Sequence, residues 1–120
     1  MGLCGLNRLL RYPAPPGRME KTAMTLNEIL QDIHALEEDL NMYERKYGVL
    51  SETFYDAYLQ GEEPPEAAWV ADWNDWAGVH EIWLNRRQRY QTVIALLQKQ
   101  TNLIDLIQRA AHRESIPLPA

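Results

Sequence analysis

The stretch "WVADWNDWAGVHEIW" spans residues 69–83 and contains all four tryptophans of this 120-residue chain. At about 100° per residue along an α-helix, the four indoles fall within a stripe about 80° wide. The stripe continues at alternating intervals of four and three residues, which is the spacing of a helical seam. The pattern predicts one long helix over about residues 65–98. Its seam comprises Trp69, Trp73, Trp76, His80, Trp83, Arg87, Tyr90, Ile94 and Leu97.

A second seam lies upstream of the tryptophans. The segment "TLNE" places Thr25 three residues before Glu28, the spacing of a capping box at a helix N-terminus. Gly48 is suited to end the same helix, so we expect this helix over residues 25–47. Its apolar residues recur at alternating intervals of three and four: Leu26, Ile29, Ile33, Leu36, Leu40, Tyr43 and Tyr47.

A short helix is expected between the two seams. Ser51 is a good N-cap and Gly61 a good stop, and Phe54, Ala57 and Tyr58 share one face. The predicted fold class is therefore all-α: an antiparallel helical hairpin or coiled coil with a short connecting helix and a long C-terminal helix. The tryptophan stripe should face the first two helices. Gly78 lies within the long helix, which suggests close approach of another backbone there.

The long seam exceeds the cover that the first helix offers. Apolar residues continue to about residue 112, and Gln100-Thr101-Asn102 is the expected position of any break. An uncovered apolar stripe must either fold back on its own chain or meet another chain. We therefore expect a partner-binding set along this stripe. The set comprises Trp69, Trp73, Trp76, Trp83, Tyr90, Ile94, Leu97, Ile104 and Ile107.

The ends of the chain differ from the middle in composition. Residues 1–23 contain "PAPPG" and no sustained period, which predicts a disordered arm or a mis-assigned start upstream of Met19 or Met24. The helical domain is expected over 24–116, followed by a tail over 117–120. Cys4 is the one cysteine, which fits a reducing compartment, and no apolar run approaches the length of a membrane span. These features favour a cytoplasmic protein that does not enter a membrane.

Charge is distributed unevenly along the chain. Residues 27–82 carry fourteen acidic side chains against two basic ones, whereas the segments on either side have a positive net charge. Such an acidic surface suits a basic partner and would repel nucleic-acid phosphate, so no direct nucleic-acid binding is expected. A solvated helix surface explains the same charges.

No catalytic or cofactor motif is found in the sequence. The three histidines are far apart, none has a glutamate three positions before it, and no phosphate-binding loop occurs. We expect no enzyme activity, no cofactor and no metal. The minor alternative is an all-α, Mg²⁺-dependent nucleotide hydrolase whose paired acidic motifs would be Glu37, Glu38, Asp72 and Asp75. His80 is expected to be a hydrogen-bonded core histidine.

The segments "ERKYGVLSETFYDAYLQGE" (44–62) and "WNDWAGVHEIW" (73–83) resemble a group of small helical prokaryotic proteins. In that group a Lys-Tyr-Gly turn, a Ser-led Phe-Tyr helix and a Trp-Ala-Gly segment follow in this order. Its members resemble the antitoxins of two-gene toxin–antitoxin pairs. The resemblance covers about a third of the chain, and "EPPEAAWVAD" (63–72) departs from it by a longer, proline-bearing spacer.

Two functions remain open on the sequence alone. In the first, the chain is a non-catalytic protein-binding module, antitoxin-like, that neutralises a small basic toxin. In the second, it is a self-assembling coiled-coil protein whose surplus seam forms a homodimer. The two predict different stoichiometry with a partner protein.

Overall fold

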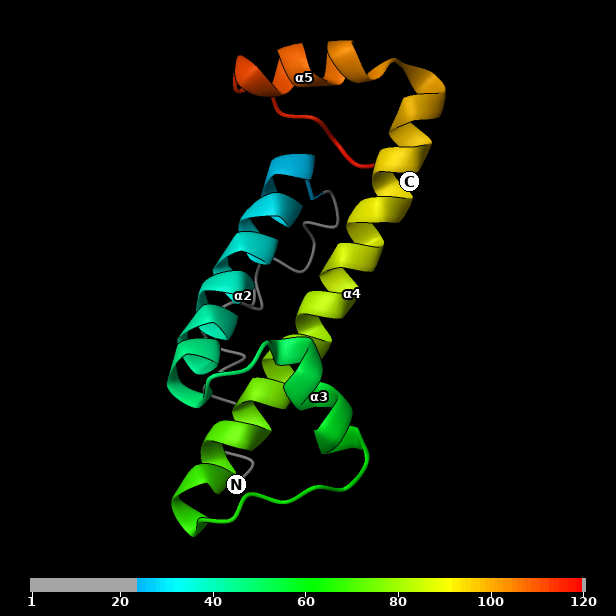
Figure 1. The fold of residues 1–120 in the computed structure, drawn as a ribbon. Coiled ribbons are helices and arrows are strands. Elements are labelled where there is room, and N and C mark those ends of the chain that lie inside the picture. Colours follow the sequence, from blue (N-terminus) through cyan, green and yellow to red (C-terminus); the bar gives the residue numbers. More distant parts are fainter. Residues whose placement is uncertain (1–23, 120) are drawn as a thin grey trace, which may run out of the picture.

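The computed structural model describes residues 24–119, and the expectations for residues 1–23 lie outside this range. The described chain folds into helices, and the all-α class is confirmed. Figure 1 shows two long helices side by side, a short helix packed at one end of the pair and another laid across the opposite end. In chain order the elements are α2 (Leu26–Tyr47), α3 (Ser51–Leu59), the 3-10 turn η2 (Ala67–Trp69), α4 (Val70–Gln100) and α5 (Leu103–Ala111).

Helices α2 and α4 run antiparallel, as their side-chain contacts show. Along α2, Asp32 meets Arg86 at 3.3 Å, Glu37 meets Trp83 at 3.1 Å, and Tyr47 meets Asp72 at 2.8 Å. The residue numbers of these contacting pairs rise along α2 and fall along α4, which is the order of an antiparallel pair. The whole predicted seam of α2 is buried or half-buried, because its 3–4 spacing keeps these residues on one face.

The N-terminus of α2 is the predicted one. Thr25 accepts the backbone N–H of Glu28, and the Glu28 carboxylate accepts the N–H of Thr25 in return, which completes the capping box. At the other end Gly48 adopts φ +82° and stops the helix, a conformation that favours glycine. The start of the long helix differs from the expectation near residue 65: the 3-10 turn begins at Ala67 and α4 proper at Val70.

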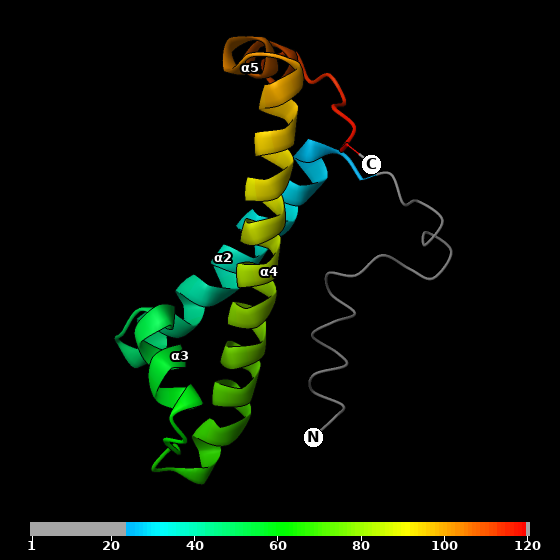
Figure 2. The ribbon, with the colours of Figure 1, turned by 90° about the vertical axis from the view of Figure 1, so that its right-hand side faces the viewer.

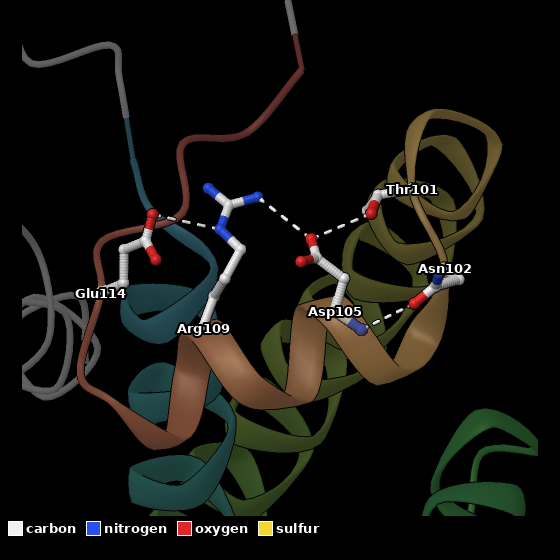
Figure 3. A network of polar contacts seen from close by, with 5 residues as sticks. All are labelled: Thr101, Asn102, Asp105, Arg109 and Glu114. Atoms are coloured by element: carbon white, nitrogen blue, oxygen red, sulfur yellow. Dashed lines mark hydrogen bonds and ion pairs between the residues drawn. The ribbon is translucent and has the colours of Figure 1, made fainter.

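The expected break is confirmed, and of the apolar residues beyond it Leu106 is buried while Leu103, Ile104 and Ile107 stay exposed. Helix α4 ends at Gln100, and α5 lies across the end of α4 in both Figure 1 and Figure 2. Asn102 caps α5 by accepting the N–H of Asp105 at 2.7 Å, while the Thr101 hydroxyl donates to the Asp105 carboxylate. Figure 3 shows how Arg109 then bridges Asp105 and Glu114, which ties α5 to the segment that follows it.

The C-terminal segment returns to the first residues of α2. The N–H of Leu26 donates to the carbonyl of Ile116 at 2.9 Å, and the N–H of Leu118 donates to the carbonyl of Met24 at 3.3 Å. Ile116 is buried and Leu118 half-buried, so the structured part continues beyond the expected end at residue 116. Ile116 belongs to a hydrophobic core at this end of the hairpin, which we call the upper core. It comprises Leu26, Ile29, Ile33, Val93, Leu97, Leu106 and Ile116.

Gly78 does not have the close neighbour that its place in a helix suggested. A Cβ atom added there would meet no side chain or distant backbone within 4 Å, so the expectation of close backbone approach is wrong. Nothing in the packing compensates for the conformational freedom that glycine brings to the middle of α4.

Replacing Gly78 should therefore stabilise the fold. We expect Gly78→Ala to raise the free energy of unfolding by about 0.5–1 kcal/mol, because alanine has the higher helix propensity and open space receives its methyl group. The matched control, Gly48→Ala, should lower it by about 1 kcal/mol because Gly48 has φ +82°. Urea denaturation followed by circular dichroism measures both; a destabilising Gly78→Ala would contradict the argument.

Candidate protein-binding site

The lower end of the hairpin is organised around the indole of Trp76. This side chain is 1% exposed and lies flat on Phe54 of α3, with ring centroids 3.9 Å apart and an interplanar angle of 1°. Tyr43 and Tyr47 of α2 stack on it at 5.7 and 5.5 Å. Three helices thus meet on one ring. The prediction that the tryptophan stripe faces the first two helices is confirmed.

A chain of hydrogen bonds fixes the start of α3 to the same indole. Trp76 Nε1 donates to the hydroxyl of Ser51 at 2.9 Å, and that hydroxyl donates to the Glu44 carboxylate at 2.7 Å. Glu44 also accepts the backbone N–H of Ser51. Ser51 was expected to be the N-cap of α3, but it is the first residue of the helix. A glutamate from α2 satisfies its N–H instead.

Tyrosine hydroxyls join the acidic side chains of α4 at the rim of this aromatic cluster. Tyr43 donates to Asp75 and Tyr47 to Asp72, both at 2.8 Å, and Lys46 pairs with Asp72 at 2.6 Å. Burial and the hydrogen bond to Asp72 raise the pKa of Tyr47 to about 12. Burial alone would raise the pKa of Asp72, but the hydrogen bonds from Lys46 and Tyr47 lower it. These contacts keep Asp72 ionised and oriented.

Two hollows flank the turn between α2 and α3. The aromatic groove, about 440 Å³, is lined by Lys46, Tyr47, Val49, Thr53, Phe54, Ala57, Trp69, Trp73 and Trp76. The acidic pocket, about 260 Å³, is lined by Glu37, Leu40, Asn41, Glu44, Leu50, Ser51, Glu52, His80 and Trp83. Val49 lines the first hollow and Leu50 the second, and their side chains are 42% and 59% exposed. The two hollows therefore share a border at Val49 and Leu50, which are adjacent apolar residues of one turn.

Each hollow is lined by a residue that has one buried polar atom without a hydrogen-bond partner in the described part of the chain. These atoms are Nε1 of Trp73, which lines the aromatic groove, and Nδ1 of His80, which lines the acidic pocket. Within residues 24–119 these are the two buried side-chain nitrogen or oxygen atoms that have no hydrogen-bond partner. An unpaired buried polar atom costs about 1–3 kcal/mol, so native folds rarely keep one without a reason. His80 is buried as expected, but the expectation that its ring is fully hydrogen-bonded is corrected.

The surroundings of His80 favour its neutral form. Desolvation lowers its pKa, and this outweighs the negative charges of Glu52, Glu44 and Glu81, which act in the opposite direction. The ring packs between Tyr55 at 4.8 Å and Trp83 at 5.5 Å. A neutral imidazole retains one nitrogen lone pair that can accept a hydrogen bond.

A separate apolar surface lies on α5 at the opposite end of the molecule. Leu106 is the one buried residue of this helix. Leu103, Ile104 and Ile107 are 48%, 63% and 53% exposed, whereas Leu106 lies in the upper core. We call these three residues the α5 face.

The predicted partner-binding residues divide into buried and accessible groups. Trp76 and Leu97 are 1% and 6% exposed and belong to the chain's own core, so their assignment to a partner is corrected. Tyr90 and Ile94 are half-buried and pack on the upper core. The apolar stripe is covered there by the first turns of α2, by Leu106 of α5 and by Ile116 of the C-terminal segment, which belong to the same core.

The accessible predicted residues do not form one surface. Trp69 and Trp73 are half-buried in the aromatic groove, and Trp83 is half-buried beside the acidic pocket. Ile104 and Ile107 are exposed on α5, at the other end of a molecule 51 Å long. Because the chain turns at Asn102, between α4 and α5, the residues that the sequence predicts on one continuous stripe lie on two separate surfaces.

The four acidic residues of the hydrolase alternative are not gathered together. Glu37 reaches Trp83, whereas Asp72 bonds Tyr47 about ten residues farther along the hairpin. Across residues 24–119, no three histidine, cysteine, aspartate or glutamate side chains come close enough to hold a metal ion. In the same part of the chain, no helix has the length and apolar character required to cross a bilayer.

Three comparisons with known proteins complete the description. Models of protein families, characterised proteins and solved structures give no match to this chain. The comparisons therefore supply no function for this chain.

Sequence reasoning missed the residues that form the acidic pocket. From the sequence, Ser51 is a predicted N-cap and Glu37 is one of the four acidic residues of the hydrolase alternative, and neither pattern predicts a pocket shared with Glu44 and Glu52. One sequence feature could have indicated this site. The segment "YGVLSE" (47–52) places two apolar residues, Val49 and Leu50, in a turn, and apolar residues exposed in a turn indicate a binding surface.

The state of His80 predicts how stability depends on pH. The folded protein disfavours the protonated ring, whereas the unfolded chain protonates near the ordinary pKa of 6.5. The free energy of unfolding should therefore be highest above about pH 7 and fall as the pH drops through 6.5, because the unfolded state then binds more protons. In His80→Gln this fall should be smaller. Urea denaturation at pH 7.5 and 5.5 measures it.

The control is His34→Gln, because His34 is exposed on α2 and lines neither hollow. It should keep the pH dependence of the natural chain. An equal loss of pH dependence in both variants would contradict the assignment to His80.

Proposed function

We propose that this chain is a non-catalytic protein-binding module that covers a basic partner protein in the cytoplasm, as an antitoxin covers its toxin. The proposal joins the sequence resemblance to antitoxins with the site at the α2–α3 turn. The observation that carries it is the pair of adjacent hollows, each lined by a residue that has a buried polar atom without a partner within residues 24–119. A bound protein would supply the missing hydrogen bonds and cover Val49 and Leu50.

Charge favours a basic partner at this end. Residues 37–82, which form the end with α3, carry twelve acidic side chains against Arg45 and Lys46, a net charge of −10. The described residues at the opposite end, 24–36 and 83–119, have a net charge of +2. Such a separation orients a basic protein toward the α3 end during encounter and speeds association, and the effect weakens as salt is added.

Aromatic and apolar side chains favour the same place as the contact surface. Trp and Tyr are the residues most often found at the energetic centres of interfaces, and both border the aromatic groove. Leu50 is 59% exposed between acidic neighbours, a mixture that suits a partner with both basic and apolar side chains.

A variant at the turn tests this proposal. The chain would be co-expressed with the product of the adjacent gene, and the affinity of the purified complex measured by calorimetry. We expect Leu50→Arg to weaken the complex at least tenfold, because it places a cation at the mouth of the acidic pocket. The control is Leu59→Arg, equally exposed at 62% on α3 but outside both hollows. Equal effects of both variants, or no complex with the natural chain, would refute the proposal.

The second candidate is a homodimer, and the α5 face favours it. Leu103, Ile104 and Ile107 leave an apolar surface on a helix that is otherwise fixed by its caps and by Arg109. A second copy of the chain is one way to cover such a face. This function could exist beside binding of a basic partner, because the two surfaces are at opposite ends.

Sedimentation distinguishes the two functions. If the chain dimerises through the α5 face, Ile104→Asp with Ile107→Asp should yield a monomer while the helical content is unchanged, because both side chains are exposed. The pair Ile94→Asp and Leu97→Asp is unsuited to this test. Leu97 is buried in the upper core, so this pair should cost several kcal/mol and unfold the hairpin. A natural chain that is already monomeric would exclude the homodimer.

A further inference from the structure

We infer that the acidic pocket is a receptor for a single arginine side chain of the basic partner. The inference rests on the proposed function and names the chemistry that the pocket recognises. Its guanidinium would lie among the carboxylates of Glu37, Glu44 and Glu52 and donate a hydrogen bond to His80 Nδ1.

Among residues 24–119, no lysine or arginine lines the acidic pocket. Three carboxylates from α2 and α3 line one hollow of about 260 Å³, and no cation within residues 24–119 pairs with any of them. Glu37 accepts from Trp83 Nε1 and Glu44 from Ser51, so both are held in place by neutral donors. A bound cation would compensate the negative charge of this surface.

The guest is larger than a metal ion. No three acidic or histidine side chains of the described chain approach closely enough to share one ion, although three carboxylates line this hollow. The volume is also below the roughly 300–1,000 Å³ of sites for drug-sized ligands and cofactors. A single long side chain with several charged donors is larger than a metal ion and smaller than a drug-sized ligand.

His80 supplies an observation independent of the charges. The residue is 4% exposed, lines the pocket, and its Nδ1 atom has no hydrogen-bond partner in the described part of the chain. Burial lowers the pKa of the ring and keeps it neutral, so Nδ1 can accept an N–H from the guest. A protonated ring would instead repel a cationic guest.

The remaining lining favours guanidinium over ammonium. Leu40 and Leu50, which line the pocket, offer apolar contact for the methylene stem. Five N–H donors in one plane can reach several carboxylates at once, whereas an ammonium is a compact point charge.

The test uses the full chain and a capped peptide, acetyl-Gly-Arg-Gly-amide, followed by NMR of the Trp83 indole and the His80 imidazole. We expect saturable shifts at both residues, weaker binding of the lysine peptide, and no saturable shift with the citrulline peptide, which keeps the shape and loses the charge. Glu52→Gln should weaken binding about three- to tenfold, because it removes one exposed carboxylate partner of the guanidinium. The control Glu38→Gln removes the same charge from exposed α2 surface outside the pocket.

Each contrary result has a distinct meaning. Equal loss in Glu52→Gln and Glu38→Gln, or equal binding of the citrulline peptide, would overturn the inference, because the general field or the shape would then explain binding. No shift in the natural chain would also overturn it. If a shift appears once Arg8, Arg11, Arg18 and Lys21 are changed to glutamine, the occupant is the chain's own N-terminal segment and not a partner.

The outcome is separable from that of the proposed function. Peptide binding needs no product of the adjacent gene, so saturable binding without a complex would leave the arginine pocket in place and refute the proposed function. A complex that Leu50→Arg disrupts, with no peptide binding, would refute the pocket alone.

Discussion

The stack of Phe54 on Trp76 is the contact on which the lower half of the molecule depends. Helix α3 has nine residues, too few to be stable alone in water, so its position comes from packing. The ring of Phe54 at 3.9 Å and the hydroxyl of Ser51 at 2.9 Å anchor the helix to one indole of α4. Both hollows are built against α3. The geometry of the candidate site therefore follows from this single attachment.

The two ends of the hairpin are closed by different means. The upper core is aliphatic, and α5 and the returning C-terminal segment cover it. The lower core is aromatic, and hydroxyl donors at its rim reach Asp72, Asp75 and Glu44. Aromatic rings with polar edges can lie half in solvent, which aliphatic side chains do less well. The lower end can therefore present a structured surface with hollows.

The unfavourable polar features of the fold lie beside the two hollows. Trp73 Nε1 and His80 Nδ1 are buried without partners, and three carboxylates share one hollow beside His80. A fold selected for stability alone would place leucine or phenylalanine at such positions. Local violations of this kind are expected at functional sites, and here they coincide with exposed Val49 and Leu50.

The sequence by itself determined the helices and the faces that they bury. The 3–4 spacing from Leu26 to Tyr47, the Thr25–Glu28 capping box, the stop at Gly48 and the break at Gln100-Thr101-Asn102 depend on neighbours within one or two turns. Tertiary structure decided how far α2 covers α4, where α5 turns, and that Ile116 and Leu118 return to Leu26 and Met24. It also decided the acidic pocket, because Glu37, Ser51 and His80 come from three helices. Their meeting depends on helix register across the hairpin, which periodicity along one chain does not specify.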